Sequence, residues 1–263
     1  MVNKYFNVVV KPTILASKLA VVYGSGDIVF DWHAVDVPKG ASKLIGVTAI
    51  IRKKHGTATN EYPFQLVYAK SINNVAPSSL GTVNAIIGKS SFLAKDYNTN
   101  LIDNGVQIAS LTQGGADSEK PSIVLEGEPN SGTNVGYDKL YVGMIAEGAF
   151  DFTTAAEISQ TIDVSGLSAA QFVNADIEGT DPRIVFAPGD VIHAADDVNI
   201  GEIESIPDAN TINFKADGSK TASETDFTVP ADLAAWIAAT GDLADGDELI
   251  NVNPIKIILH FEK

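Results

Sequence analysis

Cysteine is absent from all 263 residues of the chain, which excludes disulfide bridges and thiolate-ligated metal sites. Long apolar runs are missing too, because none approaches the roughly 20 residues that a helix needs to cross a bilayer. The run before Lys11 and Pro12 is too short for the core of a signal peptide. We therefore expect a protein that is made in the cytoplasm, with no membrane partner.

Motifs for catalysis and cofactor binding are missing as well. Gly88-Lys89-Ser90 matches the end of a phosphate-binding loop, but Val83 stands where its first glycine is required. Gly24-Ser25-Gly26 lacks the third glycine of a dinucleotide site. The four histidines of the chain are His33, His55, His193 and His260. No two of them have the spacing of a metal-binding pair. We name no catalytic, cofactor-binding or metal-ligating residue, expect no cofactor, and predict that the chain is not an enzyme.

Two acidic clusters and one basic cluster are the remaining candidates for binding. Residues 196–199 and 245–248 offer carboxylate oxygens that could ligate Ca²⁺, although neither has the spacing of an EF-hand loop. Solvated turns are the simpler interpretation. Residues 52–55, Arg-Lys-Lys-His, are too few and too poor in aromatics for a nucleic-acid site. We expect no direct contact with nucleic acid.

Charge is distributed unevenly along the chain. Residues 1–120 hold 12 Lys and Arg against 8 Asp and Glu, a net charge of +4, whereas residues 121–263 hold 6 against 25, a net charge of −19. This division indicates two physical units, of which the basic one could face a negatively charged neighbour. A merely well-solvated acidic surface is the alternative.

Apolar patterning predicts strands over most of the chain. Residues 5–10, 19–23, 28–32, 64–69 and 140–146 are rich in β-branched and aromatic residues. Residues 44–52 are apolar enough for a central strand buried on both faces. Residues 186–214 predict a small antiparallel barrel or meander, with a Pro-Gly-Asp turn at 188–190 before a strand at 191–193. The predicted class is all-β.

The C-terminal strand suggests how the two units are connected. Residues 255–261 resemble the first 150 residues more than the acidic segment before them, so we predict that they pair inside the N-terminal sheet beside residues 4–10. The predicted organisation is a discontinuous β-sandwich or jelly-roll-like domain, residues 1–156 plus 254–263, with an inserted acidic small β-barrel at 157–253. One helix is predicted inside the insertion at 230–239, between Pro230 and the stop at Gly241.

Four stretches of the sequence resemble a known class of proteins. They are NKYFNVVVKPT, DIVFDWHAVDVPKGASKLIGVTAII, PGDVIHAADDVNIGEIESIPDANTINF and DELINVNPIKIILHFEK. Together they resemble virion structural proteins of marine tailed phages, especially myophages of cyanobacteria. The resemblance implies an oligomeric protein of the capsid surface, most simply a homotrimer, that decorates or cements the shell by binding the major capsid protein. The basic N-terminal domain would dock and the acidic insertion would point outward.

A recognition module, either tail-associated or carbohydrate-binding, is the alternative function. Sugar sites present exposed aromatic rings, for which the candidates are Trp32, Tyr137, Tyr141 and Trp236. Trp32 and Tyr141 lie on predicted strands and Trp236 on the apolar face of the predicted helix, so core packing accounts better for these three. Only Tyr137 lies in a predicted loop. A hydrolase is disfavoured because no nucleophile pairs with a base by motif.

Overall fold

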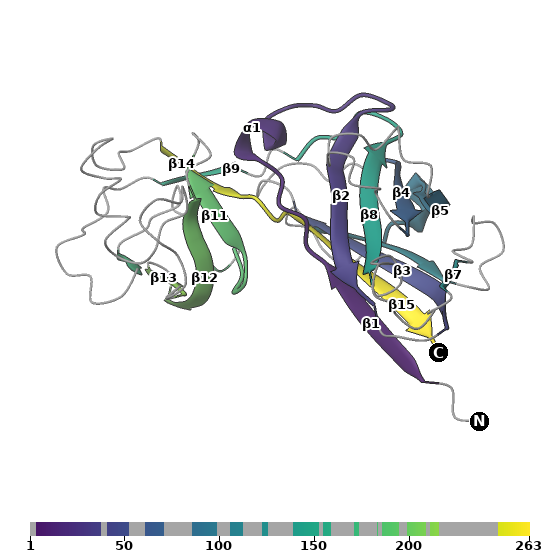
Figure 1. Cartoon of the computed structure of the whole chain (residues 1–263). Helices are drawn as coiled ribbons and strands as arrows, with labels where there is room; N and C mark the ends of the chain where they lie inside the picture. The colour runs from purple at the N-terminus through teal and green to yellow at the C-terminus, as the bar shows by residue number, and fades with distance from the viewer. Residues whose placement is uncertain are drawn as a thin grey trace.

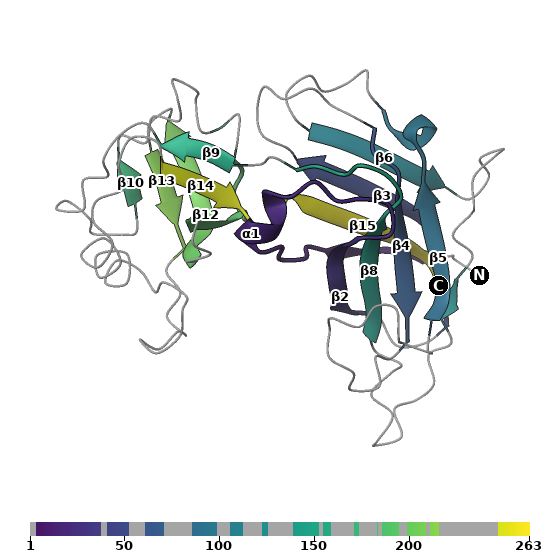
Figure 2. The same cartoon turned by 90° about the horizontal axis from the view of Figure 1, so that it is seen from above.

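The structure, a computed structural model, consists of strands in three antiparallel sheets (Figures 1 and 2). It describes residues 4–37, 41–52, 61–70, 86–98, 106–112, 123–125, 139–152, 155–158, 171–173, 183, 186–194, 199–208, 211–215 and 247–263. Two of the sheets form a sandwich, and the third lies beside it, on the left in Figure 1. The predicted all-β class is confirmed.

The first sheet of the sandwich joins the two ends of the described chain. Its strands run in the order β1 (Tyr5–Val10), β15 (Ile255–Glu262), β3 (Ser42–Arg52) and β6 (Val106–Thr112), and the short β7 (Val124–Leu125) pairs with the start of β3. Strand β15 is hydrogen-bonded on both sides, since Leu259 lies opposite Val8 on β1 and opposite Val47 on β3. The predicted pairing of the C-terminal strand beside residues 4–10 is therefore confirmed.

The second sheet crosses the first and covers its inner face, as Figure 2 shows. Its order is β2 (Ile28–Asp36), β8 (Lys139–Ala146), β4 (Phe64–Ala69) and β5 (Ile86–Phe92). When the eight long strands of the sandwich are numbered in chain order, the two sheets read 1-8-3-6 and 2-7-4-5. The chain thus crosses repeatedly between the two sheets. Each sheet therefore contains strands that are distant in sequence.

Alternation along the strands explains which face each residue occupies. On β15 the apolar residues Ile255, Ile257, Leu259 and Phe261 are buried, and the residues between them are half-buried. Strand β3 alternates in the same way, with Val47 and Ala49 buried and Thr48 half-buried. The expectation that β3 is buried on both faces is wrong. It is central in its sheet, but only its inner face is fully covered.

Aromatic rings fill the centre of the sandwich. Phe64 and Phe92 stack across β4 and β5 with ring centroids 4.5 Å apart, and Phe150 lies edge-on to Phe64 at 6.2 Å. All three rings are buried, and burial of each contributes about 2–3 kcal/mol to stability. These contacts tie strands that are distant in sequence into one core.

The third sheet contains six strands. Their order is β10 (Gln171–Val173), β13 (Thr211–Phe214), β12 (Asn199–Asp208), β11 (Val191–Ala194), β14 (Asp247–Asn251) and β9 (Ala155–Ile158). Strands β11, β12 and β13 lie where the sequence predicts them. Within the described part of the chain no ladder joins β9 to β10, so closure into a barrel stays a prediction. The domain limits at 157 and 253 also stay predictions; β9 spans the first of them.

Some local predictions are wrong. Residues 19–23 do not form a strand: the chain makes a one-turn helix, α1 (Ala16–Leu19), and Tyr23 then forms an isolated bridge to Phe150. Leu19 and Tyr23 are buried and Val21 is exposed, whereas a strand would place all three side chains on the same face. The sequence also predicts a turn at Gly88-Lys89-Ser90, after a strand over residues 83–87, but Gly88 lies within β5, opposite Tyr68. A short 3₁₀ helix, η2 (Ala94–Asp96), follows β5.

Helices are otherwise scarce in the part of the chain that the structure describes. The predicted helix at 230–239 lies outside the described residues. Among the helices that are described, none is long and apolar enough to cross a membrane.

Candidate functional site at the junction of the two units

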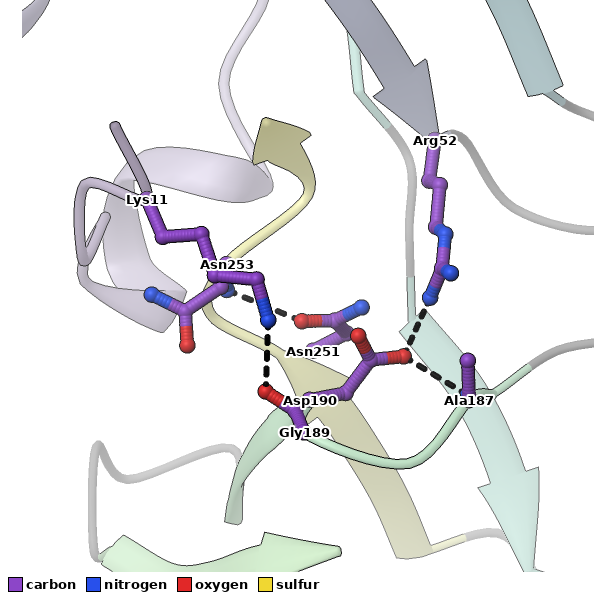
Figure 3. A network of polar contacts seen from close by, with 7 residues as sticks. All are labelled: Lys11, Arg52, Ala187, Gly189, Asp190, Asn251 and Asn253. Carbon is purple, nitrogen blue, oxygen red and sulfur yellow. Dashed lines mark hydrogen bonds and ion pairs between the residues drawn. The ribbon is translucent and has the colours of Figure 1, made fainter. Parts of the chain in front are cut away.

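The chain passes from the third sheet into the sandwich through Val252, Asn253 and Pro254, between β14 and β15 (Figure 3). Both units bind this link through backbone hydrogen bonds. The N–H of Val252 donates to the Val191 carbonyl of β11 at 3.0 Å, and the Val252 carbonyl accepts from Ile14 at 2.8 Å. The Pro254 carbonyl accepts from the Arg52 N–H at 2.8 Å. The link therefore holds the third sheet against the sandwich on both sides.

An ion pair crosses the same junction. Asp190 ends the Pro-Gly-Asp turn before β11, and its buried carboxylate accepts hydrogen bonds from the Ala187 N–H at 2.8 Å and from the Arg52 guanidinium at the end of β3. Burial raises the pKa of Asp190 above its ordinary value, and the positive charge of Arg52 opposes that rise. A carboxylate this buried requires a counter-charge, and Arg52 supplies it from 138 positions away.

The turn that carries Asp190 requires a glycine. Gly189 has φ +86°, a conformation that side chains with a Cβ rarely adopt. Its N–H donates to the Ile203 carbonyl at 2.7 Å, and its carbonyl accepts from Lys11 Nζ at 3.0 Å. A Cβ at this position would lie 3.3 Å from Lys11 Nζ. Gly189 thus allows both the turn and the close approach of the sandwich.

Two buried asparagines complete the network. Asn253 Nδ2 donates to the Pro12 carbonyl at 2.9 Å, and the Asn253 N–H donates to Asn251 Oδ1 at 2.9 Å. Pro12 follows β1, so this amide connects the link directly to the segment after the first strand. Each bond satisfies a polar group that would otherwise be buried at a cost of about 1–3 kcal/mol.

A small cleft of about 150 Å³ opens beside this network. Its lining includes three cations, Lys11, Arg52 and Lys256, and one carboxylate, Asp190, which is already paired. The other lining residues are Ile50, Pro188, Asn253 and Pro254. The cleft therefore has an excess of positive charge, and its size suits a single carboxylate or a similar small anion. Binding such a group and holding the two units together are what this arrangement can do chemically.

The aromatic candidates for a sugar site are placed as core residues where the structure describes them. Trp32 is buried with Val67 and Ala69, and Tyr141 is half-buried against this cluster. Val67 alternates on β4 with Leu66, which faces the main core, so the cluster lies on the opposite face of the second sheet. The core packing expected for Trp32 and Tyr141 is confirmed. Tyr137 and Trp236 lie outside the described residues.

The titratable candidates do not converge. Within the described ranges, no three His, Asp or Glu side chains could together hold a metal ion. His193 is buried on β11, and His260 is half-buried on β15 in the other unit. Residues 196–198 and 245–246 of the acidic clusters lie outside the described residues, whereas residues 247 and 248 begin β14. The two clusters stay calcium candidates by sequence alone.

Sequence reasoning missed Lys11, Arg52 and Asp190 as a group. Only the Pro-Gly-Asp turn carried a local signal, and it identified the turn without its distant partners. A scan against protein-family models finds no match for the chain, and a search of curated proteins finds no similar one.

Proposed function

We propose that the chain is a non-enzymatic structural protein of a tailed-phage particle that decorates or cements the capsid shell. The observation that carries this proposal is the strand order of the sandwich, 1-8-3-6 over 2-7-4-5. This order supports a jelly-roll interpretation of the sandwich, the architecture of two Greek keys that viral capsid proteins and lectins use. The sequence resemblance to phage virion proteins supports the same function. Because one fold serves many functions, the docking surface needs its own argument.

The outer face of the first sheet supports docking to an acidic neighbour. Lys43, Arg52 and Lys256 occupy outward positions on β3 and β15, and Lys11 follows β1 at the junction cleft. A carboxylate of the major capsid protein would enter the cleft and bind Lys11 and Lys256, while Arg52 stays paired with Asp190. Such contacts depend on salt, because the Debye length is about 8 Å at physiological ionic strength.

The junction would also set the direction in which the acidic half points. With a net charge of −19 in residues 121–263, that half is repelled by nucleic acid and by an acidic shell. The ion pair and the bound link hold the third sheet to one side of the sandwich, so docking would fix the direction in which the third sheet points, which we propose is away from the shell. A homotrimer suits this role, since closed cyclic oligomers match symmetry axes of a shell.

Antibodies against the chain test the proposed location on virus particles purified from its source. Labelling of the head surface, with the chain detected in the particles by mass spectrometry, is the expected result. Labelling confined to the tail would replace capsid decoration with the tail-associated function. Particles that lack the chain would overturn the proposal.

Charge reversal tests the proposed docking surface. The variant K11E/K256E should be lost from particles, whereas K4E/K18E, which reverses two exposed lysines outside the lining of the cleft, should be retained. Light scattering of the purified chain, with calcium and with a chelator, gives the oligomeric state. A trimer in both conditions is expected; a monomer would contradict the proposed homotrimer.

A further inference from the structure

A second hollow lies on the outer face of the first sheet, at the end away from the junction. It measures about 510 Å³ and is lined by residues of β1, β3 and β15: Tyr5, Asn7, Ile45, Gly46, His260, Phe261 and Glu262. In Figure 1 this end of β15 lies near the chain end marked C. Glu262 lies six positions after Lys256 of the junction cleft, a distance of about 20 Å along an extended strand. The hollow is therefore distinct from the junction cleft.

A chain of hydrogen bonds runs across four strands to one wall of this hollow. Ser110 Oγ donates to Thr48 Oγ1 at 3.4 Å, Thr48 Oγ1 lies 3.0 Å from His260 Nε2, and His260 Nδ1 lies 2.9 Å from Asn7 Oδ1. An amide oxygen only accepts, so the His260 ring carries its proton on Nδ1 and donates to Asn7. In a neutral ring Nε2 then accepts from the Thr48 hydroxyl. This chain of hydrogen bonds fixes the orientation of the Asn7 amide and leaves its two Nδ2 hydrogens to donate to a ligand.

Glycine forms part of the floor. Gly46 lies directly opposite His260, and a Cβ there would lie 3.2 Å from the Leu111 carbonyl oxygen and 3.4 Å from His260 Cδ2. The missing side chain keeps the hollow open beside the imidazole ring. Tyr5 stands at the rim, opposite Glu262 in the β1–β15 register, with 67% of its surface exposed. An aromatic face, an amide and a carboxylate thus surround one open space.

We propose that this hollow binds a neutral saccharide. The C–H face of a pyranose ring would stack on Tyr5, because those hydrogens carry partial positive charge and the aromatic face carries partial negative charge. The sugar hydroxyls would accept from the Asn7 amide and donate to the Glu262 carboxylate. The volume lies within the range of small-ligand sites, which combine apolar walls with a few convergent polar groups.

The lining also decides against other ligand classes. Glu262 is the one charged group among the seven lining residues, so the lining favours a neutral ligand over an anion. A purely apolar ligand would cover the Asn7 amide without replacing its hydrogen bonds to water, at a cost of about 1–3 kcal/mol. A neutral polyhydroxylated ring carries no negative charge toward Glu262 and can replace the hydrogen bonds of the Asn7 amide to water. This site does not rest on the proposed capsid role and can be tested on the isolated chain.

The test is a titration of the full ¹⁵N-labelled chain with methyl glycosides of glucose, galactose, mannose and N-acetylglucosamine, and with the anionic methyl glycoside of N-acetylneuraminic acid. At least one neutral glycoside should shift the Asn7 side-chain amide and the backbone signals of Tyr5 and His260, with a Kd of the order of 1 mM. Failure of every neutral glycoside to shift these signals would overturn the proposal. Tighter binding of the anionic glycoside would overturn the ligand class.

Variants then test the geometry. Y5A removes the stacking face, and N7D keeps the acceptor for the His260 ring while removing the two amide donors; each should weaken binding about tenfold or more. V9A changes an exposed residue of the same strand outside the lining and should bind like the wild type. Equal affinity in Y5A, N7D and the wild type would show that the sugar binds elsewhere. Matching amide spectra of the free variants would show that each is folded.

Discussion

Replacing Arg52 by methionine should destabilise the protein by leaving Asp190 as a buried charge without its partner. Removing one member of a buried ion pair costs about 3–5 kcal/mol. The Asp190 side chain is 6% exposed and that of Arg52 is 30% exposed, so water reaches the pair from the arginine side and lowers the cost. The Ala187 N–H also stays bound to the carboxylate. We therefore expect R52M to lower the free energy of unfolding by about 2–3 kcal/mol.

The loss in R52M should depend on pH in a defined direction. Burial already raises the pKa of Asp190 in the wild type, and without Arg52 that pKa should rise further. Between the two values the folded variant binds a proton that the folded wild type does not. The deficit of the variant therefore grows as pH rises through this window, by up to about 1.4 kcal/mol per pH unit, and is constant above it. Urea unfolding followed by circular dichroism at about pH 5 and about pH 8 measures the difference.

D190N provides the matched control, because it removes the charge and keeps the size of the side chain. The double variant R52M/D190N should be more stable than R52M at about pH 8, and its stability should not follow the pH dependence of R52M. A loss in R52M below about 0.5 kcal/mol, or an equal loss at both pH values, would refute the reasoning that Arg52 compensates a buried carboxylate.

Three further substitutions test other parts of the fold through urea unfolding. G189A should cost about 1–2 kcal/mol because of its φ of +86°, whereas G24A, at a glycine without positive φ, should cost clearly less; equal losses would contradict the strain argument. F92A should cost about 3–5 kcal/mol because its ring is fully buried, and L93A, at an exposed neighbour, should stay within about 0.5 kcal/mol of the wild type; comparable losses would contradict the assigned core. Burial and the charge of Asp27 raise the pKa of Tyr23 to about 12, so the stabilisation from its protonated hydroxyl is present below pH 10 and lost between pH 10 and about 12. Y23F removes the hydrogen bond to the Lys18 carbonyl and should lower the free energy of unfolding by about 1 kcal/mol near neutrality. Its stability should also decline less at alkaline pH, and an unchanged alkaline decline would contradict this.

Strand positions could be predicted from the sequence wherever the pattern is regular and long. Residues 64–69 form β4 as predicted, and the alternating run at 255–261 forms most of β15. The pairing of β15 with β1 could also be predicted, because an apolar strand needs partners and the acidic segment offered poorer ones. Residues 19–23 failed because Leu-Ala-Val-Val-Tyr has no periodicity that separates a strand from a helical turn followed by an irregular segment.

The contacts at the junction and the lining of the outer-face hollow could not be predicted. Arg52 and Asp190 are 138 positions apart, and neither has a local signal that specifies the other. Tyr5 lies in a strand whose pattern gives equal chances to either face, so its exposure depends on which side the second sheet covers. Asn7 and His260 meet only because the first and last strands pair in one register. In each case the feature depends on tertiary pairing, which the local sequence pattern does not specify.

The position of β15 has a consequence for biosynthesis. Strand β15 lies between β1 and β3, so the first sheet has a gap at its centre until β15 has been synthesised. The third sheet draws its strands from residues 155–251 and can assemble earlier, while β1 and β3 still await a shared neighbour. Pairing β15 with β1 closes a loop of more than 200 residues, which is slow. Until then the edges of these apolar strands stay exposed. A nascent chain that stalls before residue 255 would therefore leave unpaired the two edges of β1 and β3 that β15 would bind, and such edges can pair with other chains.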